Sequence, residues 1–171
     1  MEKKDLLKDV IKHIDIKSYN STELIDAMRN MSFTSRDTAR AADILMMMCK
    51  EKECTNILTL AGSTSAAGCM QVYVDMVRNK MIDVVVATGA SIIDMDLFEA
   101  LGFKHYIGEK ENVIADTTLR DLYIDRIYDT YIDEEELQAC DHTTFEIANM
   151  LEARPYSSRE FIYEIGKWLH D

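Results

Sequence analysis

Residues 57–108, ILTLAGSTSAAGCMQVYVDMVRNKMIDVVVATGASIIDMDLFEALGFKHYIG, decide the fold of this chain. Two short β-branched runs, 56–61 and 82–88, each end in a loop of small residues and then lead into a helical pattern. Neither run alternates polar and apolar side chains, so both are expected to be strands covered on both faces. The pattern predicts a βαβ unit of a parallel sheet. Its two loops should lie together at the carboxyl edge of the strands, where nucleotides bind in such folds.

Helical patterns occupy the chain before this stretch. Residues 2–14, 20–31 and 36–52 carry apolar side chains at helical spacing, and the last of these contains AADILMMM, which is apolar nearly all round and therefore expected to be buried. We expect an N-terminal helical segment over residues 1–52 and a partial α/β domain over residues 53–171.

The pattern after residue 108 is weaker until its final third. Residues 116–132 have no clear period, which leaves short strands and an irregular excursion both open. Asp133 and Glu136 are expected to cap a helix that runs to about residue 151. Ser157 and Glu160 form a capping-box pattern before a last amphipathic helix.

Composition excludes several classes of protein. The chain has 171 residues, 47% of them hydrophobic and 29% charged, with a formal net charge of −12. These values are typical of one soluble globular unit, and no apolar run is long enough to cross a bilayer, so we expect a cytoplasmic location. The negative net charge argues against binding to nucleic acid and suits a basic protein partner, although acidic surfaces also serve solubility. The four cysteines form no CxxC pair and are expected to be reduced.

The small-residue loops carry the chemistry that the sequence suggests. Glycine allows close approach of a ligand to the backbone, and the amides at a helix N-terminus attract phosphate. Residues 62–65, GSTS, and 88–91, TGAS, repeat this chemistry after successive strands, which favours a bound nucleotide. Capping and tight turns alone remain the alternative. Neither GxGxxG nor GxxxxGK[ST] occurs, the histidines show no metal-ligand spacing, and no residue stands out as a covalent catalyst.

Asp94 and Asp96 follow the second loop directly. Three roles fit their position in the first turn of the helix expected over residues 94–101. They can cap that helix, accept a ribose hydroxyl, or hold an amine of a polycation.

The order of residues resembles that of deoxyhypusine synthase. The central segments are LTLAGSTSAAG and VDMVRNKMIDVVVATGASIIDMDLFEALGFKHYIG, and similar flanking segments include DRIYDTYIDEEEL and RPYSSREFIYEIGKWL. The resemblance runs from about residue 16 to the end. It implies a Rossmann-like parallel sheet, an oligomer, and NAD-dependent transfer of the 4-aminobutyl group of spermidine to a lysine of translation initiation factor 5A, the reaction of hypusine biosynthesis.

By motif position, the resemblance implies specific binding residues. The residues that match its NAD loops, together with an acidic residue near ribose and amine, are Gly62, Ser63, Thr64, Ser65, Ala66, Thr88, Gly89, Ala90 and Asp94, with Asp96 as the other candidate for the spermidine amine.

The family's catalytic lysine and much of its spermidine site belong to a C-terminal half that these 171 residues do not match. We therefore expect no catalytic residue here, and an isolated chain that is inactive. It is expected to be a fragment or subunit that needs a companion with the lysine. The alternatives are a non-catalytic NAD-binding modulator or truncated relative, and part of a homospermidine synthase-like enzyme.

Overall fold

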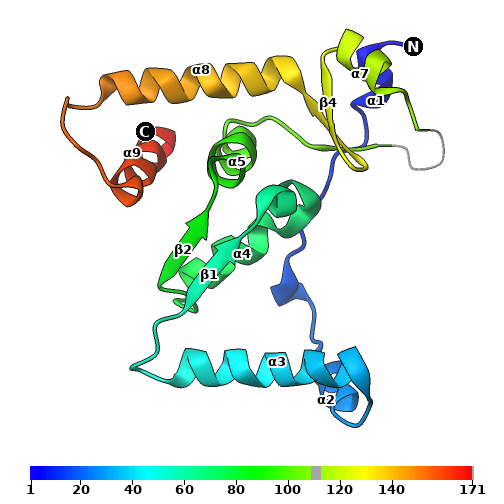
Figure 1. Ribbon diagram of the computed structural model, residues 1–171, viewed down its shortest axis with the longest axis vertical. Helices are drawn as coiled ribbons and strands as arrows, with labels where there is room; N and C mark the ends of the chain where they lie inside the picture. Colours follow the sequence, from blue (N-terminus) through cyan, green and yellow to red (C-terminus); the bar gives the residue numbers. More distant parts are fainter. Residues whose placement is uncertain (109–112, 171) are drawn as a thin grey trace. The chain divides into compact units, whose positions relative to one another are not determined.

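The computed structural model describes residues 1–108 and 113–170 (Figure 1). Residues 109–112 and 171, which fall in the expected α/β domain, lie outside the described residues. The chain groups into two compact units. The larger contains Met1–Lys12, Ala61–Gly68 and Ala87–Asp171, and the smaller contains His13–Leu60 and Cys69–Val86. The expected division into residues 1–52 and 53–171 stays a prediction.

The smaller unit contains most of the predicted βαβ segment, whose first loop, Ala61–Gly68, and last strand residue, Ala87, belong to the larger unit. The strands β1 (Ile57–Leu60) and β2 (Val84–Ala87) pair in a small parallel sheet, and α4 (Met70–Arg78) lies between them in the sequence. Asn56 and Asp83 hold the strand starts together. The Asn56 amide donates to the Asp83 carboxylate at 2.8 Å, and the Asp83 amide donates to the Asn56 carbonyl at 2.9 Å. The expected α/β class is therefore confirmed.

The rest of the smaller unit is helical. It contains η1 (Ile16–Ser18), α2 (Thr22–Met28) and α3 (Phe33–Lys50), and α2 packs along α3.

Two expectations about burial are wrong. The strands are not covered on both faces, because Ile57 is 57% exposed and the valines of β2 are also exposed. The AADILMMM segment is not buried either, since Met46 and Met47 in α3 are 52% and 61% exposed. An apolar run indicates that its side chains favour burial, but they are buried only where a neighbouring element covers them. A two-stranded sheet has little surface to cover side chains on either face or on a neighbouring helix.

The larger unit is built around an antiparallel sheet. β4 (Ile124–Ile127) and β5 (Thr130–Asp133) form a hairpin, and β3 (Tyr106–Ile107) pairs with the other edge of β5. Of the two possibilities left open for residues 116–132, the ordered one is present, with α7 (Asp116–Asp121) preceding the hairpin.

Adjacent residues of β5 face two different apolar clusters. Ile132 packs with Phe98, Cys140 and other residues of one cluster, whereas Tyr131 packs with Leu6, Leu119 and Ile124 of the other. The alternation follows from the two-residue period of a strand. β5 thereby connects α1 (Lys3–Leu6) and α7 on one face with α8 (Glu134–Met150) on the other.

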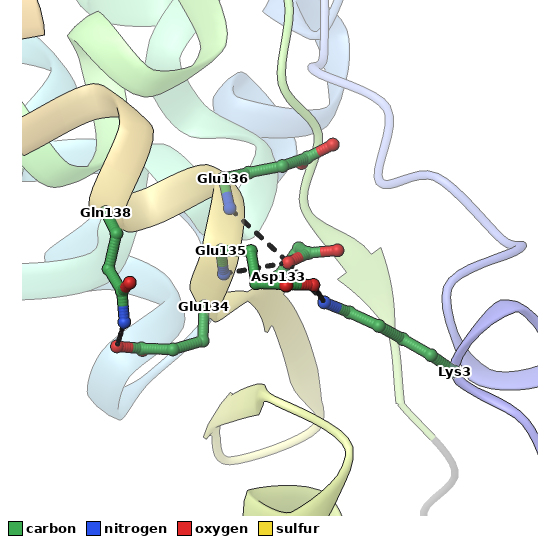
Figure 2. A network of polar contacts seen from close by, with 6 residues as sticks. All are labelled: Lys3, Asp133, Glu134, Glu135, Glu136 and Gln138. Carbon is green, nitrogen blue, oxygen red and sulfur yellow. Dashed lines mark hydrogen bonds and ion pairs between the residues drawn. The ribbon is translucent and has the colours of Figure 1, made fainter. Parts of the chain in front are cut away.

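The predicted caps at Asp133 and at the Ser157–Glu160 pair are confirmed, whereas the Glu136 carboxylate, expected to take part in the first cap, interacts with the Lys104 backbone instead. Asp133 is the N-cap of α8 and accepts hydrogen bonds from the backbone amides of Glu135 and Glu136 at 2.9 and 3.4 Å (Figure 2). Before α9 (Ser158–His170), Ser157 and Glu160 bond reciprocally through side chain and backbone. Among the described residues, no helix combines the length and apolar character that crossing a membrane requires.

Candidate functional site

The first small-residue loop follows β1 and belongs to the larger unit from Ala61 to Gly68. It forms a 3₁₀ turn, η2 (Gly62–Thr64), and then a π-helical turn, η3 (Ser65–Cys69), before α4 begins. Gly68 has φ +98°, and a Cβ there would lie 3.0 Å from the carbonyl oxygen of Lys12. Only glycine fits this turn without displacing the backbone beside it.

The second loop has the same plan. Thr88 precedes α5 (Gly89–Ser91), which continues through the π-helical η4 (Ile92–Leu97) into α6 (Phe98–Ala100). π-helical turns are rare and occur frequently at functional sites. Here one follows each loop.

One hydrogen bond joins the two loops. The buried Ser91 hydroxyl donates to the Gly62 carbonyl oxygen at 3.0 Å. The expectation that the loops lie together is confirmed by this contact. It fixes the spacing of the first loop against the start of the second helix.

The residues named from the sequence differ in exposure within these loops. Ser65 and Ala66 are each 1% exposed, Gly62 and Ser63 are half-buried, and Thr64 is exposed. In the second loop, the exposed residues are Thr88, Gly89 and Ala90. The Ser65 hydroxyl has no hydrogen-bond partner within the described part of the chain. A buried hydroxyl in this state is a candidate donor to a bound group.

Asp94 and Asp96 lie inside the second helix, not at its start. Because that helix begins at Gly89, the interpretation of either aspartate as its N-terminal cap is wrong. Both residues are half-buried. Burial, followed by the negative charge of Asp141 on α8, raises the pKa of Asp94. The negative charges of Asp94 and Asp141 disfavour each other, so a bound cation such as an amine would stabilise the ionised form of Asp94.

A cavity of about 400 Å³ opens beside the first loop. The loop side of its lining consists of Ala61, Gly62, Ser63, Thr64, Ala66 and Ala67. The opposite side is the tip of the β4–β5 hairpin, Ile127 to Thr130. Among the described lining residues, only Asp129 is charged.

The structure thus brings the predicted first loop to a cavity and connects the second loop to it through Ser91. Neither the second loop nor Asp94 is among the described residues that line the cavity. The contribution of the hairpin tip was not predicted from the sequence. The only sequence sign of this turn is the position of Tyr128–Asp129 between two strand-like runs, IDRI and TYID. The dipeptide lacks the glycine or asparagine that usually marks a two-residue hairpin turn.

The hydrogen-bond donors of the first loop, which are backbone amides and hydroxyls, fit part of a dinucleotide. Small side chains let a ligand approach the backbone of the first loop, and amides at the start of the helical segment can face a phosphate. Without lysine or arginine among the described lining residues, phosphate charge would have to be met by the main chain. The hydroxyls of Ser63 and Thr64 add donors at the same wall.

A second cavity, of about 680 Å³, lies elsewhere in the larger unit, between α7, β4 and the start of α8. Asp125 and Glu134 line it and hydrogen-bond to each other. That bond, followed by burial, raises the pKa of Asp125 to about 6. Arg126, also in the lining, pairs with Asp116 at 2.6 Å.

Comparison with known proteins agrees with the resemblance seen in the sequence. The family model described as deoxyhypusine synthase matches residues 23–171. A deoxyhypusine synthase-like protein of Caulobacter vibrioides is 67% identical over 168 residues, which cover 98% of this chain and 45% of that protein. A protein of the same description from Coxiella burnetii is 60% identical, covering 98% of this chain and 47% of that protein.

A more distant relative also matches most of the chain. A probable deoxyhypusine synthase 2 of Methanosarcina acetivorans is 37% identical over 156 residues, covering 91% of this chain and 44% of that protein. The chain therefore spans about half the length of the curated relatives it matches.

Proposed function

The chain belongs to the deoxyhypusine synthase family, and on that premise we propose that it supplies the NAD-binding part of an aminobutyl transferase. The full reaction would move the 4-aminobutyl group of spermidine to a lysine of translation initiation factor 5A. NAD would serve as the temporary hydride acceptor in that reaction. The observation that carries the proposal is the Ser91–Gly62 hydrogen bond, which joins two loops of nucleotide-binding type beside a cavity.

Each part of the site has a distinct role in this proposal. The first loop, Gly62 to Ala66, holds the ribose and phosphates of NAD through backbone amides and hydroxyls. Thr88, Gly89 and Ala90 extend the same binding surface. Asp94 holds an amine of spermidine, because a carboxylate near Asp141 is stabilised by a cation. Asp96 is the second candidate for that amine.

The proposal includes a companion. The small β1–β2 sheet would be part of a larger Rossmann-like parallel sheet, completed by a segment of the kind present in the longer relatives. This companion would carry the lysine that accepts the aminobutyl group. The net charge of −12 suits the basic, lysine-containing region of the factor that receives the group, and a cytoplasmic location follows from that substrate.

The test is an activity assay with a complementing half. The remaining part of the Caulobacter vibrioides relative is a suitable companion, because that protein is 67% identical to this chain where they align. We expect spermidine-dependent formation of NADH in the mixture and none with this chain alone. Turnover by the isolated chain would contradict the need for a companion. Failure in every mixture, with NAD still bound, would favour a non-catalytic modulator.

Substitution of Asp94 separates amine binding from NAD binding. Asp94→Asn should raise the spermidine concentration needed for turnover in the complemented mixture. NAD affinity should change little, since Asp94 is not among the described residues of the cavity beside the first loop.

A further inference from the structure

The β4–β5 hairpin tip forms the wall of the cavity that faces the first loop. Ile127 pairs with Thr130, so Tyr128 and Asp129 make a two-residue turn. Tyr128 is 89% exposed and is one of the residues that line the cavity. The opposite wall is the loop from Ala61 to Ala67. The cavity therefore has an aromatic residue, Tyr128, on one side and small residues on the other.

The backbone of this turn is held on both sides. Arg126 donates from Nη1 to the Tyr128 carbonyl at 3.1 Å, and its guanidinium is itself anchored by Asp116. The Gly108 amide donates to the Asp129 carbonyl at 2.7 Å. A Cβ on Gly108 would lie about 3.0 Å from the Tyr131 ring, so glycine is required for this close approach. The turn is thus fixed while the Tyr128 ring remains exposed.

Tyrosine is a costly residue at this position. Tyr128 has φ +53°, a left-handed conformation that glycine or asparagine adopts at lower cost. Its ring is almost fully exposed, so packing within the chain does not compensate for that cost. Residues strained in this way cluster at ligand-binding sites, and Tyr128 is among the residues that line a cavity.

We propose that Tyr128 is a ligand-binding residue whose ring stacks on a planar base of the nucleotide held by the first loop. This inference rests on the proposed NAD site and adds a wall that the sequence motifs do not contain. A tyrosine ring offers a large flat surface and loses few rotatable bonds on ordering. Stacking on an aromatic side chain suits any base, and the adenine and nicotinamide ends of a dinucleotide are both candidates.

The chain offers a matched control in Tyr123. That residue has φ +56°, is 58% exposed, and precedes β4 at the other end of the same strand. It lines the second cavity, not the one beside the first loop. Tyr123→Gly and Tyr128→Gly both remove an exposed ring and both relieve a left-handed backbone. Only the latter alters the proposed stacking wall.

The experiment measures NAD binding to the whole chain by calorimetry, together with thermal unfolding without ligand. Tyr128→Gly should weaken NAD binding roughly tenfold or more, whereas Tyr123→Gly and Tyr128→Phe should stay within about twofold of the wild type. Neither glycine variant should unfold at a lower temperature than the wild type. A ring with a purely structural role would instead lower stability and affinity together.

Two further ligands identify the base. ADP-ribose carries adenine without nicotinamide, and nicotinamide mononucleotide carries the reverse. The ligand whose affinity falls in Tyr128→Gly is the one that contains the stacked base.

Several results would overturn the inference. Equal losses in both glycine variants would assign the effect to the hairpin as a whole, and an equal loss in Tyr128→Phe would assign it to the hydroxyl. Unchanged binding by Tyr128→Gly would remove the stacking wall but leave the NAD site standing. No binding of NAD by the wild-type chain would contradict the proposed function itself, and the inference with it.

Discussion

At the scale of single residues, the carboxyl groups of Asp125 and Glu134 share one hydrogen bond, which requires one proton between them. The bond raises the pKa of Asp125 to about 6 and lowers the pKa of Glu134. The unfolded chain releases the Asp125 proton near its usual value of 3.8. Between about pH 4 and pH 6 the folded state therefore binds more protons than the unfolded state, and this pair's contribution to stability falls as the pH rises.

Asp125→Asn should remove that dependence, because an amide donates a hydrogen bond to Glu134 at every pH. We expect the variant to gain stability relative to the wild type as the pH rises from about 4 to about 7. Urea unfolding at a series of pH values measures the effect. Asp121→Asn, which removes a charge at the exposed end of α7, is the control and should run parallel to the wild type. A parallel curve for Asp125→Asn would contradict the shared proton.

Single residues also show where local sequence suffices for prediction. The caps at Asp133 and Ser157 were predictable, since capping depends on residues within one turn of each helix. The position of Asp94 was not, because Thr88 and Gly89 start the helix earlier than the apolar pattern indicates. The pattern shows which side chains favour a core, but not where the backbone first turns.

At the scale of elements, the start of α8 connects distant parts of the larger unit. Besides capping α8, the Asp133 carboxylate accepts a hydrogen bond from the Lys3 ammonium at 2.5 Å, and Lys3 also reaches Glu135 at 2.8 Å (Figure 2). Asp133 is also the last residue of β5, so a single side chain joins the N-terminal helix, the sheet and α8.

Asp133→Ala should lower the free energy of unfolding by about 1–2 kcal/mol, because it removes the cap of a 17-residue helix and leaves Lys3 with one partner fewer. Asp133→Asn keeps a capping oxygen and should lose less than half as much. Urea denaturation of the three proteins gives the comparison. Equal stability of wild type and alanine variant would show that the α8 start does not depend on this cap.

The elements that sequence failed to predict depend on distant partners. The β4–β5 hairpin has a Tyr–Asp turn whose Asp129 carbonyl accepts a hydrogen bond from the Gly108 amide, and a partner so far along the chain does not appear in a local pattern. The prediction that the strands are buried was wrong for a related reason, because burial depends on elements that cover the strands. Ile57 and Val86 belong to runs whose composition is typical of covered strands, yet these two residues are 57% and 54% exposed.

At the scale of the whole molecule, the chain exposes apolar side chains that none of its own described elements cover. They include side chains of β1, β2 and α3, among them Ile57, Val86, Met46 and Met47. Surface of this kind marks interaction sites more often than chance exposure. We therefore expect the chain to associate with itself or with a companion, as the sequence also predicted.

Sedimentation of the wild type and a Met46→Lys/Met47→Lys variant tests this expectation. The wild type should be oligomeric at micromolar concentration, and the variant should shift toward monomer. Its unfolding free energy should change by less than about 0.5 kcal/mol, because both side chains are largely exposed. A wild type that is monomeric in the absence of any partner would contradict self-association.

The central claim is that the first loop binds NAD, and a calorimetric titration of the chain with NAD tests it most directly. Ala67→Asp places a carboxylate in the wall of the cavity, where it would repel the phosphates. Ala153→Asp makes the same change at an exposed position outside that wall. We predict NAD binding by the wild type and by Ala153→Asp, and a loss of about tenfold or more in Ala67→Asp. Absence of binding by the wild type, or equal affinity in all three proteins, would contradict the account.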